Sequence, residues 1–82
     1  MKKLINIIKN LKSDDDIKHF LVSLFSPEEV VEFEKRLKII KQLSKGSSQR
    51  EVAENLKVGI ATVSRGAKEL KKGHFKKILK YI

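Results

Sequence analysis

The chain has 82 residues, and a folded monomer of this length hides only about 60–65% of its unfolded surface, which excludes a large enzyme. Lys and Arg number 19 against 10 Asp and Glu, and the resulting net charge of +9 favours a polyanionic partner. The chain has no cysteine, which excludes disulfides and thiolate sites and favours a cytoplasmic location. No stretch approaches the ~18–20 apolar residues of a membrane-spanning helix, so we expect no membrane partner.

The first part of the chain carries two apolar stripes at helical spacing. The stripes consist of Leu4, Ile7, Ile8 and Leu11, and of Ile17, Phe20, Leu21 and Leu24. Between them, Ser13 and the three aspartates that follow predict an N-cap and an acidic first turn, which complements the helix dipole. The opening MKKLINIIKNLK has the charged start of a secretory signal, but Asn6 and Lys9 interrupt its apolar run, so we interpret it as a helix.

A third and longer helix is predicted from Pro27 to Lys45. Ser26 can cap it, Pro27 lacks an amide hydrogen where none is needed, and Glu29 has the spacing of a capping box. Gly46 follows its end, as is typical of a helix C-terminus. Its apolar face consists of Val30, Phe33, Leu37 and Ile40, widened by Ile39 and Leu43.

Three further helices are predicted in the second part of the chain. Ser48 and Glu51 repeat the capping-box spacing and begin a short helix that runs to about Leu56. Another helix runs from Ile60 to about Lys72, and Gly73 separates it from a last helix that ends the chain. Because strand signals are missing and the sequence has only four Gly and one Pro, we expect an all-α fold of six helices in one domain, residues 1–82.

The charges are distributed unevenly along the chain. Residues 13–34 hold seven acids and one base, whereas residues 65–82 hold seven bases and one acid. Such an asymmetry often reflects only two solvent-exposed faces of opposite charge. Here the basic stretch directly adjoins a motif in residues 49–65.

The segment QREVAENLKVGIATVSR has the pattern of a DNA-binding helix-turn-helix, whose second helix enters the major groove. Its predicted interior consists of Val52, Leu56, Val58 and Val63, with the small Ala53 between the helices. The turn position that usually holds Gly is Lys57, and a left-handed conformation there costs about 1 kcal/mol. The alternative interpretation is two capped helices that simply pack in a bundle.

The segments SQREVAENLKVGIATVSRG and SPEEVVEFEKRLKIIKQLSKG resemble the tryptophan repressor family. The match covers Leu24–Lys72, and GIATVSRG is its most specific part. The resemblance implies an intertwined homodimer in which residues 1–45 form a shared core. Residues 48–72 would form the helix-turn-helix, and residues 73–82 the C-terminal helix. Such a dimer would also remedy the small core of a single chain.

The resemblance also implies a pocket for an amino-acid effector, with L-tryptophan as the candidate corepressor. Arg36 and Arg65 would flank a flat ring, and Arg65 would also pair with the carboxylate. The other positions that the family pattern places at this cleft are Ser26, Thr62 and Gly66. Glu69 stands where the family has a small hydroxyl residue; its carboxylate could hold an ammonium group, or fill the pocket by pairing with either arginine.

The resemblance to the tryptophan repressor family also implies which residues contact double-stranded DNA. Arg50 would contact a guanine edge, and Gln49 with Lys71 or Lys72 would contact phosphates. The positions at the start of the second short helix that would meet bases, phosphates or bridging waters are Gly59, Ile60, Ala61, Thr62, Ser64 and Arg65.

The sequence bears on three other function classes. Catalysis finds little support, because His19 and His74 have no nucleophile or metal-spaced partner, and we expect no enzyme and no metal. A basic protein lying on anionic membranes is disfavoured by the capped internal helices. The rival to an effector-controlled repressor is a ligand-independent helix-turn-helix regulator with a self-filled or altered pocket.

Overall fold

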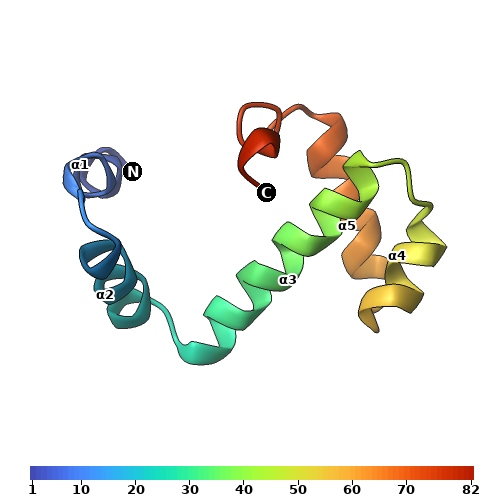
Figure 1. The fold of residues 1–82 in the computed structure, drawn as a ribbon, viewed down its shortest axis with the longest axis horizontal. Helices are drawn as coiled ribbons and strands as arrows, with labels where there is room; N and C mark the ends of the chain where they lie inside the picture. Colours follow the sequence, from blue (N-terminus) through green and yellow to red (C-terminus); the bar gives the residue numbers. More distant parts are fainter. The chain divides into compact units, whose positions relative to one another are not determined.

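The computed structural model describes residues 1–82 and contains helices but no strand, which confirms the all-α prediction. The chain forms five α-helices and a final 3-10 helix, and Figure 1 labels the α-helices in chain order. Their bounds are α1 Lys2–Asn10, α2 Asp14–Leu24, α3 Pro27–Ser44, α4 Gln49–Leu56, α5 Ile60–Lys71 and η1 Leu79–Tyr81. The residues group into two compact units, 1–31 and 32–82. Organisation as one domain stays a prediction.

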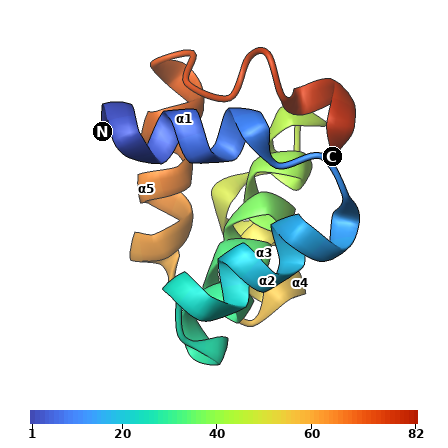
Figure 2. The same ribbon diagram turned by 90° about the vertical axis from the view of Figure 1, so that its left-hand side faces the viewer.

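The N-terminal unit holds α1, α2 and the start of α3 (Figure 2). The hydroxyl of Ser13 accepts a hydrogen bond from the amide of Asp16 at 3.1 Å, which confirms the predicted cap of α2. Neither α1 nor α2 contains a buried residue, although both carry the predicted apolar stripes. Ile8 and Leu24, for example, are each 53% exposed in the single chain.

Two capping boxes begin α3 and α4. At α3, the amide of Glu29 donates to the Ser26 hydroxyl at 3.2 Å, and the amide of Ser26 donates to the Glu29 carboxylate at 2.9 Å. At α4, Ser48 and Glu51 exchange the same two bonds at 3.1 and 3.0 Å. Both boxes were predicted, and each satisfies two amides that the first turn of a helix leaves without partners.

Because of the two capping boxes, we expect acid to destabilise the protein. The Ser26 and Ser48 amides hold the pKa values of Glu29 and Glu51 below their ordinary value of 4.5. Because the folded-state values are the lower ones, the stabilisation is present above pH 4.5 and is lost as the pH falls through the folded-state values. The melting temperature is measured at about pH 6 and at about pH 3. It should fall less between the two for Glu51→Gln than for the unchanged chain. An equal drop would contradict the assignment.

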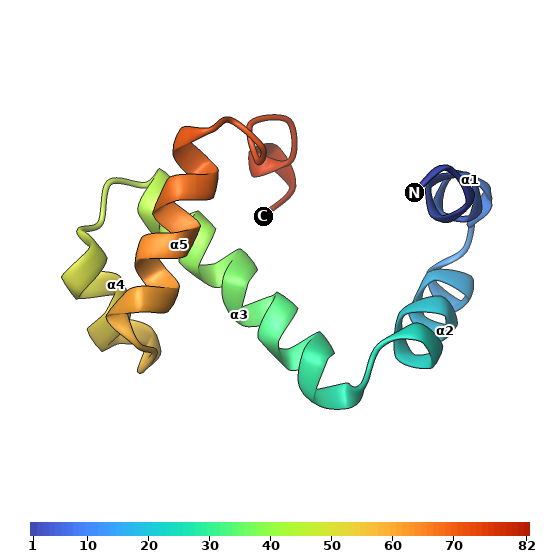
Figure 3. The same cartoon turned by 180° about the vertical axis from the view of Figure 1, so that it is seen from behind.

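The C-terminal unit is built around the contact of α3, α4 and α5, which Figure 3 shows from behind. Ile39, Val52 and Val63, one from each helix, are at most 1% exposed and form its core. The partly buried side chains packed against them are Leu43, Ala53, Leu56 and Val58. This confirms the predicted interior of the two short helices and adds α3 to it.

Lys57, directly after α4, adopts the left-handed conformation, with φ 54° and ψ 46°. It is the only residue other than glycine with a positive φ, so the turn expected from the sequence forms in spite of the side chain. The amide of Val58 donates to the carbonyl of Ala53 at 3.1 Å and closes the end of the helix.

Lys57→Gly is expected to raise the free energy of unfolding by roughly 0.5–1 kcal/mol, since it removes a left-handed Cβ but adds freedom to the unfolded chain. Thermal or urea unfolding at fixed protein concentration measures the change. The matched control is Lys45→Gly, at a turn residue outside the left-handed region, which should gain no stability. Equal effects of both changes would show that the Lys57 conformation carries no strain.

The prediction of a sixth helix over residues 73–82 is wrong. Gly73 has φ 85°, and the chain beyond it forms successive turns that reach only the short 3-10 helix. In this segment backbone amides donate to carbonyls three residues earlier, as the amide of Ile78 does to the carbonyl of Phe75 at 3.0 Å. Isolated helices shorter than about 12 residues are marginal, and an apolar spacing of three and four residues fits such turns as well as a helix.

None of the helices combines the length and the apolar character that crossing a bilayer would need.

Candidate functional site

The start of α5 is exposed, as expected of a surface that meets another molecule. Ile60, Ala61 and Thr62 are all exposed there, although the fully buried Val63 follows directly. Gly59 precedes the helix without a side-chain cap, so the first amides of α5 donate no hydrogen bond to a capping side chain. An open helix start of this kind favours contact with anions.

Gln49 and Ser64, both predicted to contact DNA, are bonded to each other. The Ser64 hydroxyl donates to the side-chain carbonyl of Gln49 at 2.7 Å, which joins the start of α4 to the first turns of α5. The Gln49 amide group keeps its two hydrogens as donors for a phosphate. Ser64 is therefore placed to orient Gln49, a relation that the sequence pattern did not reveal.

The predicted basic contacts lie on exposed positions of the same unit. Arg50, in the first turn of α4, and Arg65 and Lys71 on α5 are exposed. Lys72 forms an ion pair with Glu69 at 3.4 Å, in which the two side chains are 61% and 37% exposed. An exposed pair contributes little stability, so Lys72 can exchange this partner for a phosphate.

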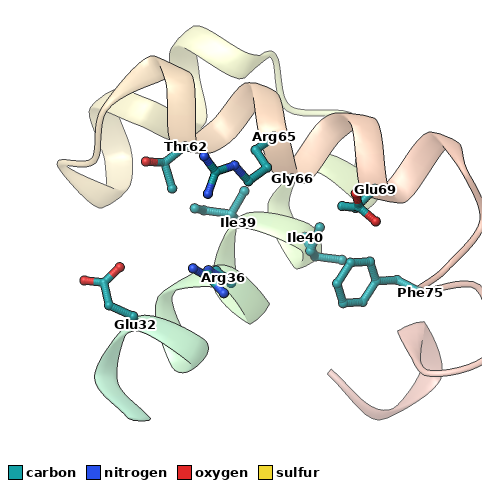
Figure 4. Close-up of a pocket in the computed structure, with 9 residues that line it drawn as sticks. All are labelled: Glu32, Arg36, Ile39, Ile40, Thr62, Arg65, Gly66, Glu69 and Phe75. Atoms are coloured by element: carbon teal, nitrogen blue, oxygen red, sulfur yellow. The ribbon is translucent and has the colours of Figure 1, made fainter. Parts of the chain in front are cut away.

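A pocket of about 390 Å³ lies between α3, α5 and the C-terminal segment (Figure 4). Its volume falls within the roughly 300–1,000 Å³ of small-molecule sites. Its lining consists of Glu32, Arg36, Ile39, Ile40, Thr62, Arg65, Gly66, Glu69 and Phe75. The structure therefore brings together Arg36, Thr62, Arg65, Gly66 and Glu69, five of the predicted ligand residues. Ser26, the sixth, belongs to the N-terminal unit, where its hydroxyl caps α3.

Gly66 allows α5 to approach α3 closely. A Cβ at this position would lie 3.0 Å from Cγ2 of Ile39 and 3.5 Å from Cδ1 of Ile40. Both isoleucines are 1% exposed, so they have little room to move aside. The missing side chain leaves an apolar floor formed by α3 beneath the polar groups of α5.

The two arginines of the pocket come from different helices. Figure 4 shows Arg36 on α3 and Arg65 on α5, with Ile39 between them. The Arg36 guanidinium lies 5.8 Å from the centre of the Phe33 ring, which helps to orient it. Neither arginine forms an ion pair with a carboxylate of the chain, so both can bind an acidic group from outside.

Glu69 is bonded to groups other than the arginines. One carboxylate oxygen lies 2.6 Å from Nδ1 of His74 and the other 3.4 Å from Nζ of Lys72. The His74 bond is the main cause that lowers the pKa of Glu69, so this carboxylate is charged at neutral pH. Of the two alternatives that the sequence left open for Glu69, the pairing with Arg36 or Arg65 that would fill the pocket is not formed.

Sequence reasoning missed Phe75, His74 and Glu32 at this site. Phe75 was assigned to the predicted last helix after Gly73, and His74 was considered only as a catalytic residue without partners. The signal was Gly73, since a glycine after a helix permits the reversal that returns the next residues to that helix. Its φ of 85° places His74 beside Glu69, five positions earlier.

The chain is similar in sequence to one family of known proteins. The family model described as "Trp repressor protein" matches residues 1–81. Proteins named "Trp operon repressor homolog" are similar in sequence: that of Vibrio vulnificus (strain YJ016) is 34% identical over 71 residues, 85% of this chain and 70% of the relative. That of Xylella fastidiosa (strain M23) is 35% identical over 78 residues, 94% of this chain and 85% of the relative. No solved structure gives a significant match. The chain belongs to the Trp repressor family.

Proposed function

We propose that this protein is a DNA-binding transcriptional repressor that acts as a homodimer through a helix-turn-helix formed by α4 and α5. The observation that carries the proposal is the packing of these two helices on Ile39, with the start of α5 exposed. The net charge of +9 supports a nucleic-acid partner, and the relatives named as repressor homologues support a regulator rather than an enzyme.

On DNA, the exposed first turn of α5 would enter the major groove, with Ile60, Ala61 and Thr62 facing base edges. Arg50 would contact a guanine, while Lys71, Lys72 and the amide group of Gln49 would contact phosphates. These phosphate contacts fix the position of the protein on DNA but do not select a sequence.

The uncovered apolar stripes of α1 and α2 support the homodimer. Neither helix buries a residue within the single chain, and Ile5, Ile8, Val22 and Leu24 are about half exposed. An apolar surface of this extent is typical of an interface between chains. Sedimentation equilibrium should give twice the mass of one chain, and a monomer at all micromolar concentrations would contradict the dimer.

The pocket supports control by an amino-acid effector, with L-tryptophan as the candidate. Arg65 and Arg36 can bind a carboxylate, the apolar floor of Ile39 and Ile40 can hold a ring, and Glu69 can bind an ammonium group. The rival proposal is a ligand-independent repressor of the same fold. Phe75 favours it, since the chain itself supplies one wall of the pocket.

One experiment decides between them. Palindromic DNA is selected from a random pool, and its affinity is measured at one salt concentration with and without millimolar L-tryptophan. A gain of about tenfold, which is roughly 1.4 kcal/mol of coupling, supports the effector-controlled repressor. Specific binding without any gain supports the ligand-independent one. Failure to select any sequence would overturn the DNA-binding proposal.

A further inference from the structure

The C-terminal segment, residues 73–82, is attached to the pocket by two neighbouring side chains. Gly73 reverses the chain after α5, His74 bonds to the Glu69 carboxylate, and Phe75 forms part of the pocket wall (Figure 4). Phe75 is partly buried, whereas the side chain of His74 is 63% exposed. The contact with Glu69 is thus at the surface, where another molecule can reach it.

Few other contacts hold this segment. It contains no fully buried residue, its backbone is bonded only in turns, and Ile78 and Tyr81 are 38% and 76% exposed. Segments with few buried apolar contacts and exposed backbone bonds open at low free-energy cost. The short His74–Glu69 bond is the side-chain hydrogen bond that joins this segment to α5.

Glu69 is at once the partner of His74 and a residue of the pocket lining. Its other oxygen already faces Lys72, and the remaining charged groups of the pocket are Arg36, Arg65 and Glu32. An ammonium group that enters the pocket is repelled by the arginines and can pair with the carboxylates, Glu32 and Glu69, of which Glu69 is the one bonded to His74. A cationic ligand group and His74 therefore compete for one carboxylate.

We propose that the His74–Glu69 contact is a latch that closes the C-terminal segment over the pocket, and that the ammonium group of a ligand opens it by replacing His74. The proposal rests on the pocket being a ligand site, as in the proposed function. Because coupling is reciprocal, opening the latch strengthens binding of such a ligand, and the ligand loosens the segment. The latch thus selects for ligands that carry an ammonium group beside a carboxylate.

The closed state is tested without any ligand. Hydrogen exchange of the amides of Ile78, Leu79 and Tyr81 should quicken by about threefold or more in His74→Ala and in Glu69→Gln. Lys72→Gln is the matched control, since it removes the other partner of Glu69 and leaves the latch intact. Because His74 is exposed, its replacement should leave the melting of the core unchanged. Exchange equal to that of the unchanged protein in both latch variants would overturn the latch.

The opening is tested with L-tryptophan and with 3-(indol-3-yl)propanoate, the same molecule without its amino group. L-tryptophan should speed exchange of the segment, and His74→Ala should bind it about threefold more tightly, whereas neither effect is expected for the propanoate. Equal effects of both molecules, or a protected segment with L-tryptophan bound, would overturn the opening. If neither molecule binds any variant, the effector proposal fails and the opening fails with it, while the ligand-free exchange still decides whether the latch exists.

Discussion

Ile39→Ala is expected to lower the free energy of unfolding by about 2–5 kcal/mol. Ile39 is 1% exposed and is the residue by which α3 joins the core of Val52 and Val63. Its Cγ2 also faces the backbone of Gly66, so its loss leaves a cavity where α3 and α5 are closest. Urea denaturation measures the change, at fixed protein concentration because a dimer is expected.

The matched control for this prediction is Ile60→Ala, which removes the same atoms from a side chain that is 53% exposed. A surface truncation of this kind should change the free energy of unfolding by no more than about 0.5 kcal/mol. If both variants lost the same stability, the core of the C-terminal unit would not lie where α3, α4 and α5 meet.

Arg50→Ala is expected to weaken binding to the selected DNA by about 1–3 kcal/mol and to relax specificity at one base pair. Arg50 is exposed in the first turn of α4, and its guanidinium can form two parallel bonds to a guanine edge. Affinities for the selected site and for each single-base variant at that position measure both effects.

Lys71→Ala is the control for Arg50, because Lys71 is exposed and is assigned to phosphate. Its loss should weaken all sequences alike and reduce the salt dependence by about one counterion. Full affinity of Arg50→Ala for the selected site would remove Arg50 from the DNA interface, even if Lys71→Ala behaved as expected.

Local signals in the sequence predicted much of the fold correctly. Ser26, Ser48 and their glutamates are three residues apart, so the capping boxes depend only on short-range geometry and were confirmed. Lys57 stands at the turn position that usually holds Gly, and the structure shows that it adopts the left-handed conformation in spite of its side chain. The interior of α4 and α5 was likewise predicted, since helical spacing decides which residues face inward.

The contacts that were missed depend on tertiary packing. Helical spacing alone does not distinguish a helix from a series of turns, so residues 73–82 were assigned wrongly. The bonds from Ser64 to Gln49 and from His74 to Glu69 each need the chain to reverse at a specific angle. Five of the six predicted ligand residues do line the pocket, but the role of Phe75 in its wall follows only from that reversal at Gly73.

The measurement that tests the central claim most directly is the dependence of DNA affinity on the spacing of two half-sites. A dimer with one α4–α5 helix-turn-helix in each chain requires half-sites about one turn of the DNA duplex apart, or a multiple of that spacing. Inserting about five base pairs between the selected half-sites turns one of them to the opposite face of the duplex, and affinity should fall at least to that of a single half-site. Equal affinity for every spacing would contradict a dimer that reads DNA through two helix-turn-helix heads.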